Sequence, residues 1–98
     1  MLSQVDLDAL VKATQNKLQV TFTYLKKTTG ETVVHTGGIY EIGGVNKAGA
    51  PCVWMWDTSS NDNIRALLNE NIISIQVLDI PFFPPQPWPI KINGAIVA

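Results

Sequence analysis

The chain has 98 residues, of which 46% are hydrophobic and 15% are charged, and its formal net charge is -1. This length suits one domain with a modest core, and this composition excludes an intrinsically disordered protein. With this net charge, electrostatics alone do not predict a polyanion-binding protein, and no apolar run reaches the roughly 20 residues that a membrane-spanning helix needs.

The first predicted element is an N-terminal helix over about residues 6–17. Its apolar side chains recur at the spacing of one helical face: Val5, Leu7, Leu10 and Val11. Ser3 or Asp6 can accept hydrogen bonds from the first backbone N–H groups and so cap this helix. We expect the apolar face to cover a sheet or barrel, since the segment has too little positive charge for a DNA-recognition helix.

Strict alternation of apolar and polar residues then predicts a strand over residues 18–24. Its buried face comprises Leu18, Val20, Phe22 and Tyr24. A turn at Gly30 leads to a second strand, which runs over residues 31–36 and resumes over residues 39–42. The intervening Gly37-Gly38 pair indicates a bulge or sharp bend, by which one long strand turns a barrel corner.

Aromatic and β-branched residues predict three further strands between residues 51 and 79. These strands cover residues 53–56, 64–68 and 72–78. The polar segments between them, residues 57–63 and 69–71, are rich in turn-forming residues. Residues 1–79 therefore predict a mainly β domain with an N-terminal helix, a small and strongly bent five-stranded barrel of the Sm-like or SH3-like kind. Closure of such a barrel removes the exposed strand edges.

Within this domain, residues 18–79 resemble a WYL domain. The resemblance is carried by Val20, Phe22, Tyr24, Gly30, Trp54-Met55-Trp56, Ile64-Arg65 and residues 71–79. WYL domains are Sm-like barrels of bacterial and phage regulators, generally attached to DNA-binding segments, and they sense nucleic acids or nucleotides. The resemblance implies that Arg65 matches a basic residue of the family's ligand surface and that His35 occupies the position of another. Met55 replaces the tyrosine of the family's Trp-Tyr-Leu triplet.

The sequence offers few residues for catalysis or metal binding. His35 is the only histidine and Cys52 the only cysteine, so the usual sets of zinc ligands and an internal disulfide are both excluded. No third group is evident to orient these two as a base and a nucleophile, and no Gly-Lys-Ser/Thr follows either glycine pair. We therefore predict a non-enzymatic protein without metal or cofactor. The lone cysteine and the absence of a signal peptide predict a cytoplasmic location.

The candidate ligand-binding residues are basic and aromatic: Arg65, His35, Tyr40, Trp54 and Trp56. The two tryptophans lie two residues apart on one strand, so they share a face of the sheet. If that face belongs to the core, they are packing residues. If it is exposed, they form a stacking platform for bases beside Arg65 and Tyr40. The polar segment 57–63 is either a loop that holds a polar ligand or a solvated hairpin loop.

Residues 80–98 form an extension of different character, with five of the six prolines and the aromatic residues Phe82, Phe83 and Trp88. Proline fixes the backbone and lacks an N–H group, so this extension should be extended and lie outside the sheet interior. Because large aromatic side chains are unfavourable in solvent, we expect them to pack against another surface. This surface belongs either to their own domain or to a neighbouring subunit or protein partner. Asn93-Gly94, between apolar residues 90–92 and 95–97, predicts a terminal hairpin that joins a sheet edge.

Two functions follow from these patterns. The leading hypothesis is a small regulatory module of the WYL type that binds a nucleic acid or a nucleotide. Its rival is a homo-oligomeric or partner-bound adaptor or inhibitor, compatible in its small size with a phage protein, that acts through Phe82, Phe83 and Trp88. Nucleic-acid binding should weaken with salt in proportion to the phosphates neutralised, and it should depend on Arg65. An adaptor should keep its association in high salt and lose it when residues 81–98 are deleted.

Overall fold

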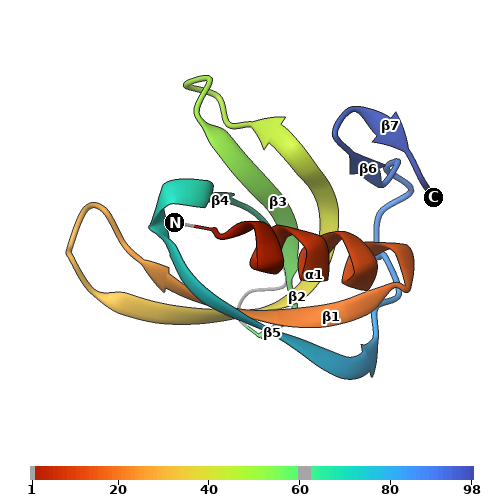
Figure 1. Cartoon of the computed structure of the whole chain (residues 1–98), viewed down its shortest axis with the longest axis horizontal. Helices are drawn as coiled ribbons and strands as arrows, with labels where there is room; N and C mark the ends of the chain where they lie inside the picture. The colour runs from red at the N-terminus through yellow and green to blue at the C-terminus, as the bar shows by residue number, and fades with distance from the viewer. Residues whose placement is uncertain (1, 60–62) are drawn as a thin grey trace.

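One helix packs against a seven-stranded sheet in the computed structural model, which describes residues 2–59 and 63–98 (Figure 1). In chain order the elements are α1 (Gln4–Gln15), β1 (Leu18–Leu25), β2 (Thr32–Val45), β3 (Pro51–Asp57), β4 (Asn63–Leu68), the 3₁₀ turn η1 (Asn69–Asn71), β5 (Ile72–Pro81), β6 (Lys91–Ile92) and β7 (Ala95–Ile96). The predicted mainly β fold with an N-terminal helix is confirmed. The predicted loop over residues 57–63 lies partly outside the described residues.

Helix α1 begins two residues earlier than predicted and is capped by Ser3, whose Oγ accepts a hydrogen bond from the backbone N–H of Asp6 at 3.1 Å. It ends at Gln15, and Lys17 adopts a positive φ of 53° before β1 begins. Leu10 and Ala13 are buried on the side that faces the sheet. The face of the sheet that α1 covers is called the inner face below, and the opposite one the outer face.

The sheet is curved but open, so the prediction of a closed barrel is wrong. Its strand order is β4-β3-β2-β1-β5, and β6 and β7 lie off this path. The turn η1 leads the chain away from β4, and β5 then pairs with β1 from Ile72 opposite Tyr24 to Pro81 opposite Leu18. Register shifts in the β1–β5 and β2–β3 ladders bend the sheet. Within residues 2–59 and 63–98 this bend stops short of a β4–β5 ladder.

The glycine pair lies within one continuous strand, β2, as the sequence predicted, but the register shifts that mark bulges in the β2–β3 ladder lie between Ile39 and Gly44, after the pair. A Cβ atom at Gly37 would lie 1.7 Å from the carbonyl oxygen of Trp56, so β3 can approach only a glycine there. A Cβ atom at Gly38 would lie 1.9 Å from the ring of Phe82. Gly38 therefore makes room on the outer face for an aromatic side chain of the C-terminal extension.

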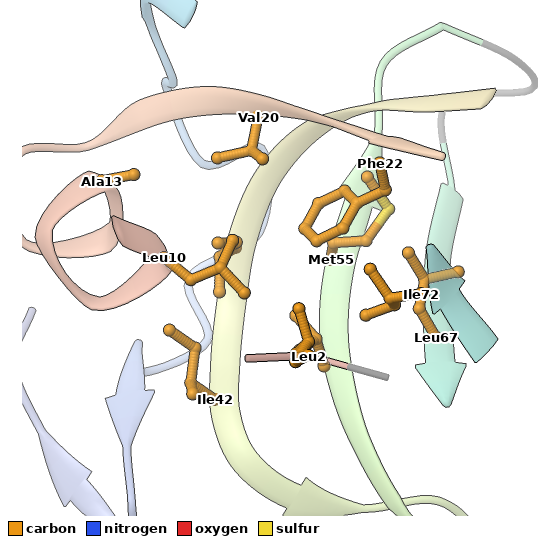
Figure 2. Packing of buried hydrophobic residues seen from close by; sticks show 11 residues of the cluster. Leu2, Leu10, Ala13, Val20, Phe22, Ile42, Met55, Leu67 and Ile72 are labelled. Atoms are coloured by element: carbon orange, nitrogen blue, oxygen red, sulfur yellow. The ribbon is translucent and has the colours of Figure 1, made fainter. Parts of the chain in front are cut away.

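The main core lies between α1 and the inner face (Figure 2). It comprises Leu2, Leu10, Ala13, Val20, Phe22, Ile39, Ile42, Val53, Met55, Leu67 and Ile72. Val20 and Phe22 have no exposed surface, and Leu18 and Tyr24 pack at the margin, so the predicted buried face of β1 is confirmed. Burial of apolar area of this kind is the main stabilising contribution of such a small domain.

The C-terminal extension packs against its own domain rather than extending into solvent. Phe82 is only 4% exposed, and it forms a second apolar cluster with Tyr40, Trp56 and Ile90 on the outer face. The predicted hairpin exists as β6 and β7 around Asn93-Gly94, both of which have positive φ. Strand β6 pairs in parallel with β2, so the hairpin joins a sheet edge as predicted (Figure 1).

Candidate ligand-binding site

The five predicted ligand residues do not form one site, because the sheet separates them. In the β3–β4 ladder Arg65 lies opposite Met55, whose side chain is in the main core. His35 likewise lies opposite Phe22 of the core in the β1–β2 ladder. Directly opposite residues of antiparallel strands project to the same face. Arg65 and His35 therefore belong to the inner face, and Tyr40, Trp54 and Trp56 belong to the outer face.

The inner-face residues meet at Asp57, which is the last residue of β3 and has no exposed surface. The Nε of Arg65 donates to Oδ2 of Asp57 at 2.6 Å, and Nδ1 of His35 lies 3.1 Å from the same oxygen. The backbone N–H and the hydroxyl of Ser59 donate to Oδ1 at 2.9 and 2.7 Å. Both carboxylate oxygens are thus engaged within the protein.

These contacts determine the protonation of Asp57. Burial by itself raises the pKa of this carboxyl group, but hydrogen bonds from Ser59, Arg65 and His35 outweigh it and hold the pKa below its ordinary value. The charge of Asp57 in turn engages Arg65 and His35. The carboxylate of this cluster is satisfied at the end of the core, and Arg65 and His35 each direct one ring or guanidinium nitrogen to it.

Sequence reasoning missed Asp57 because it assigned this residue to the polar loop. The signal that would have found it is its parity with Val53 and Met55, which lie four and two residues before it on the same strand. A charged residue at an inward position predicts a buried partner of opposite charge.

The outer-face residues lie together with the aromatic residues of the extension. The Tyr40 ring centroid lies 5.3 Å from that of Trp88 and 5.8 Å from that of Phe82, and the Trp56 and Trp88 centroids are 5.9 Å apart. The Tyr40 hydroxyl donates to the backbone carbonyl of Gln86 at 3.0 Å and accepts from its N–H at 2.9 Å. The extension is therefore fixed to β2 by both apolar and polar contacts.

A pocket of about 350 Å³ opens beside this cluster. It is lined by Tyr40, Glu41, Trp54, Ile64, Trp88, Pro89 and Lys91. The indole of Trp54 is held in place, since its Nε1 donates to the carbonyl oxygen of Val45 at 3.1 Å. The predicted ligand residues Tyr40 and Trp54 and the predicted partner residue Trp88 thus contribute to one pocket. Trp56 is 8% exposed and packs behind it as a core residue of the outer face.

The pocket wall also carries two charged residues that the sequence did not single out. Glu41 faces outward with Tyr40 because β2 has a bulge between Ile39 and Glu41. Ile39 and Ile42 both lie in the main core, and their spacing of three residues was the signal for this bulge. Lys91 lies on β6 as the register partner of Glu41, a long-range pairing that no local pattern indicates.

Phe83 and Cys52 lie at opposite extremes of exposure. Phe83 is 82% exposed, in contrast to its neighbour Phe82. Cys52 is buried, and burial together with the charge of Glu41 raises the pKa of its thiol, so it is a packing residue in its protonated form. No group of three or more His, Cys, Asp or Glu side chains suited to a metal ion occurs in the part of the chain that the structure describes.

Comparison with protein-family models, with curated proteins and with solved structures gives no match for this chain. Among residues 2–59 and 63–98, no helix has the length and apolar character that crossing a membrane requires. The interpretation of the pocket therefore depends on its own chemistry.

Proposed function

We propose that the protein is a non-enzymatic regulatory module of the WYL type, with an Sm-like fold, that binds the base of a nucleotide or of a single-stranded nucleic acid. The observation that supports this function is the pocket between Tyr40, Trp54 and Trp88. Aromatic side chains bind bases by stacking, because every base has a π face, and each stacked base contributes about 1–3 kcal/mol. The pocket volume of about 350 Å³ lies in the range typical of small-ligand sites.

Preorganisation of the aromatic walls favours such a ligand. Tyr40 is held by its two hydrogen bonds to Gln86, and Trp54 by its hydrogen bond to Val45. Side chains that are already ordered lose little conformational entropy when a ligand binds. The extension takes part in recognition because it contributes Trp88, Pro89 and Lys91 to the pocket.

The WYL resemblance supports the fold and the ligand class but not the position of the site. One helix followed by strands β1 to β5 is the element order expected for an Sm-like domain, although the sheet is open. Arg65 and His35 are the ligand residues that the resemblance implies. Asp57 already engages both, so we assign recognition to the outer face and a structural role to this pair.

The test is a titration of the full-length protein with nucleoside monophosphates and short single-stranded oligonucleotides, in which tryptophan fluorescence reports binding. We expect saturable quenching, and we expect Trp54→Ala to weaken binding roughly 5- to 150-fold through the lost stacking. Phe83→Ala is the matched control, since this aromatic residue is exposed and is not part of the pocket lining. Absence of any response, or an equal loss in both variants, would contradict the proposal.

The salt dependence gives an independent check. Among residues 2–59 and 63–98, Lys91 is the only lysine or arginine that lines the pocket, and the net charge of the chain is -1. A single phosphate contact on a single strand predicts a slope of about -0.7 for log K against log salt concentration. A slope several times steeper would indicate a wider basic surface and not this pocket.

Exposed Phe83 favours a second function, which is association with a protein partner or with a second copy of the chain. A phenylalanine that is 82% exposed next to a buried one is a candidate anchor for an interface. Deletion of residues 81–98 would remove the core residues Phe82 and Ile90. Phe83→Asp is therefore the sharper test: it should abolish association measured by light scattering in high salt. An unchanged mass of the assembly would exclude Phe83 as its anchor.

A further inference from the structure

Two opposite charges lie in register across the pocket wall, and the protein does not pair them with each other. Glu41 of β2 and Lys91 of β6 are directly paired residues of the parallel ladder, and both line the pocket. Within residues 2–59 and 63–98 no ion pair shorter than 4.0 Å joins them; the salt bridges there are Lys27–Glu70, His35–Asp57 and Arg65–Asp57. Both charges are thus available to a ligand that enters between the aromatic rings.

We propose that the pocket selects guanine among the bases, with the Glu41 carboxylate accepting from the base edge and the Lys91 ammonium group contacting the phosphate. This inference rests on the proposed function and adds the identity of the base. Guanine is the base that presents two adjacent donors, N1–H and N2–H, on its Watson–Crick edge. A carboxylate accepts both in parallel, and bonds to a charged acceptor are stronger than neutral ones.

The other bases lack this match with Glu41. Adenine and cytosine each place a ring-nitrogen acceptor beside their amino group, and this acceptor faces the carboxylate unfavourably. Uracil and thymine have a single N–H group flanked by two carbonyl oxygens. A site built to accept two hydrogen bonds discriminates strongly against ligands that leave a polar group unmatched.

Lys91 excludes another ligand class that the aromatic walls would otherwise suit. Aromatic residues with a nearby carboxylate bind quaternary ammonium groups through cation–π attraction. An ammonium group in the same wall repels such a cation but attracts a phosphate. The pairing of one carboxylate and one ammonium group therefore favours a nucleotide, which carries donors at one end and negative charge at the other.

The experiment measures the affinities of the full-length protein for GMP, IMP, AMP and guanosine by tryptophan fluorescence. IMP keeps N1–H but lacks the N2 amino group, so we expect the order GMP, IMP, AMP, with GMP bound roughly 10- to 100-fold more tightly than AMP. Guanosine lacks the phosphate and should bind roughly 5-fold more weakly than GMP. Equal affinities for GMP and AMP would overturn guanine selection and leave the proposed function intact, whereas no response to any of the four would overturn both.

Variants assign the selectivity to its residues. Glu41→Gln should reduce GMP affinity roughly 10-fold and change AMP affinity little, because the side chain keeps its shape and loses its charge. Glu31→Gln, at an exposed position outside the pocket lining, is the matched control and should change neither. Lys91→Gln should weaken GMP and leave guanosine unchanged. Selectivity that survives Glu41→Gln would overturn the assignment, provided that circular dichroism shows the variant to be folded.

Discussion

The two faces of the sheet differ in how completely their apolar and charged side chains are paired with other parts of the protein. On the inner face α1 covers the apolar side chains, and the buried Asp57 carboxylate takes hydrogen bonds from Ser59, Arg65 and His35. On the outer face the extension covers Phe82 and Trp56 but leaves a pocket beside them, with Glu41 and Lys91 in its wall.

This difference separates the residues that stabilise the fold from those that can bind a ligand. Basic residues in a sequence are readily predicted to contact a ligand, but Arg65 and His35 contact a carboxylate buried within the same domain. Aromatic residues are commonly assigned to the core, but Trp54 and Trp88 line an accessible pocket. Changes on the inner face should therefore alter stability alone, and changes on the outer face should alter binding.

The largest expected effect is a loss of stability on the outer face, and it shows whether the apolar cluster there acts as a second core. Phe82→Ala removes a side chain that is 4% exposed, and Phe83→Ala removes its neighbour, which is 82% exposed. The first change should lower the free energy of unfolding by about 3–5 kcal/mol, and the second by about 0.5 kcal/mol or less. Chemical denaturation measures both. Equal effects would mean that the extension isn't docked on Gly38.

The second effect concerns the inner face. Asp57→Ala leaves Arg65 and His35 without their shared carboxylate and should cost about 3 kcal/mol of stability. Glu70→Ala breaks the exposed Lys27–Glu70 pair, in which both side chains are more than half exposed, and should cost no more than about 1 kcal/mol. Nucleotide affinity should be unchanged in both variants. Loss of binding in a folded Asp57→Ala variant would place the ligand on the inner face.

The acid dependence of stability isolates the charge of Asp57. The folded-state pKa of this group lies below the unfolded value of about 3.9, so its contribution is fully present above that pH and is lost as the pH falls through the folded-state pKa. Asp57→Asn removes the contribution. The difference in unfolding free energy between wild type and Asp57→Asn should therefore shrink as the pH is lowered from about 6 to 2. A difference that is constant or grows in acid would show that the carboxylate isn't the stabilising group.

The strands were predictable from local patterns, whereas the open edge of the sheet was not. Alternation identified the inner face of β1, and the two predicted halves of β2 form one strand through the glycine pair. Whether a bent sheet closes depends on the summed curvature of several ladders. The register shifts in the β1–β5 ladder, which contribute to this curvature, depend on a partner strand far away in the sequence.

The site was predictable in its residue types but not in its assembly. The sequence singled out Tyr40, Trp54 and Trp88, yet it assigned the first two to ligand binding and the third to a partner. These three residues come together because the ring of Phe82 packs over Gly38, a contact across more than forty residues of sequence. Local periodicity carries no information about such a contact.

The smallest expected effect is the loss of stability when one tyrosine hydroxyl is removed from either face of the sheet. Tyr40→Phe removes the hydroxyl that both donates to and accepts from the backbone of Gln86 on the outer face. Tyr24→Phe removes a hydroxyl that accepts from the backbone N–H of Leu68, and its ring packs against the main core. Each variant keeps its ring and should lose about 1–2 kcal/mol of stability.

Binding should distinguish these two variants. Gln86 lies two residues before Trp88, so loss of the Tyr40 hydroxyl loosens one wall of the pocket and should weaken nucleotide affinity severalfold. Tyr24→Phe should leave that affinity unchanged, because the hydroxyl that it removes accepts from Leu68, and the described lining residues of the pocket include neither Tyr24 nor Leu68. Fluorescence titration and denaturation of both variants give the comparison. If both variants lose affinity equally, nucleotide affinity depends on the overall stability of the domain, and the assignment of binding to the outer face alone would be wrong.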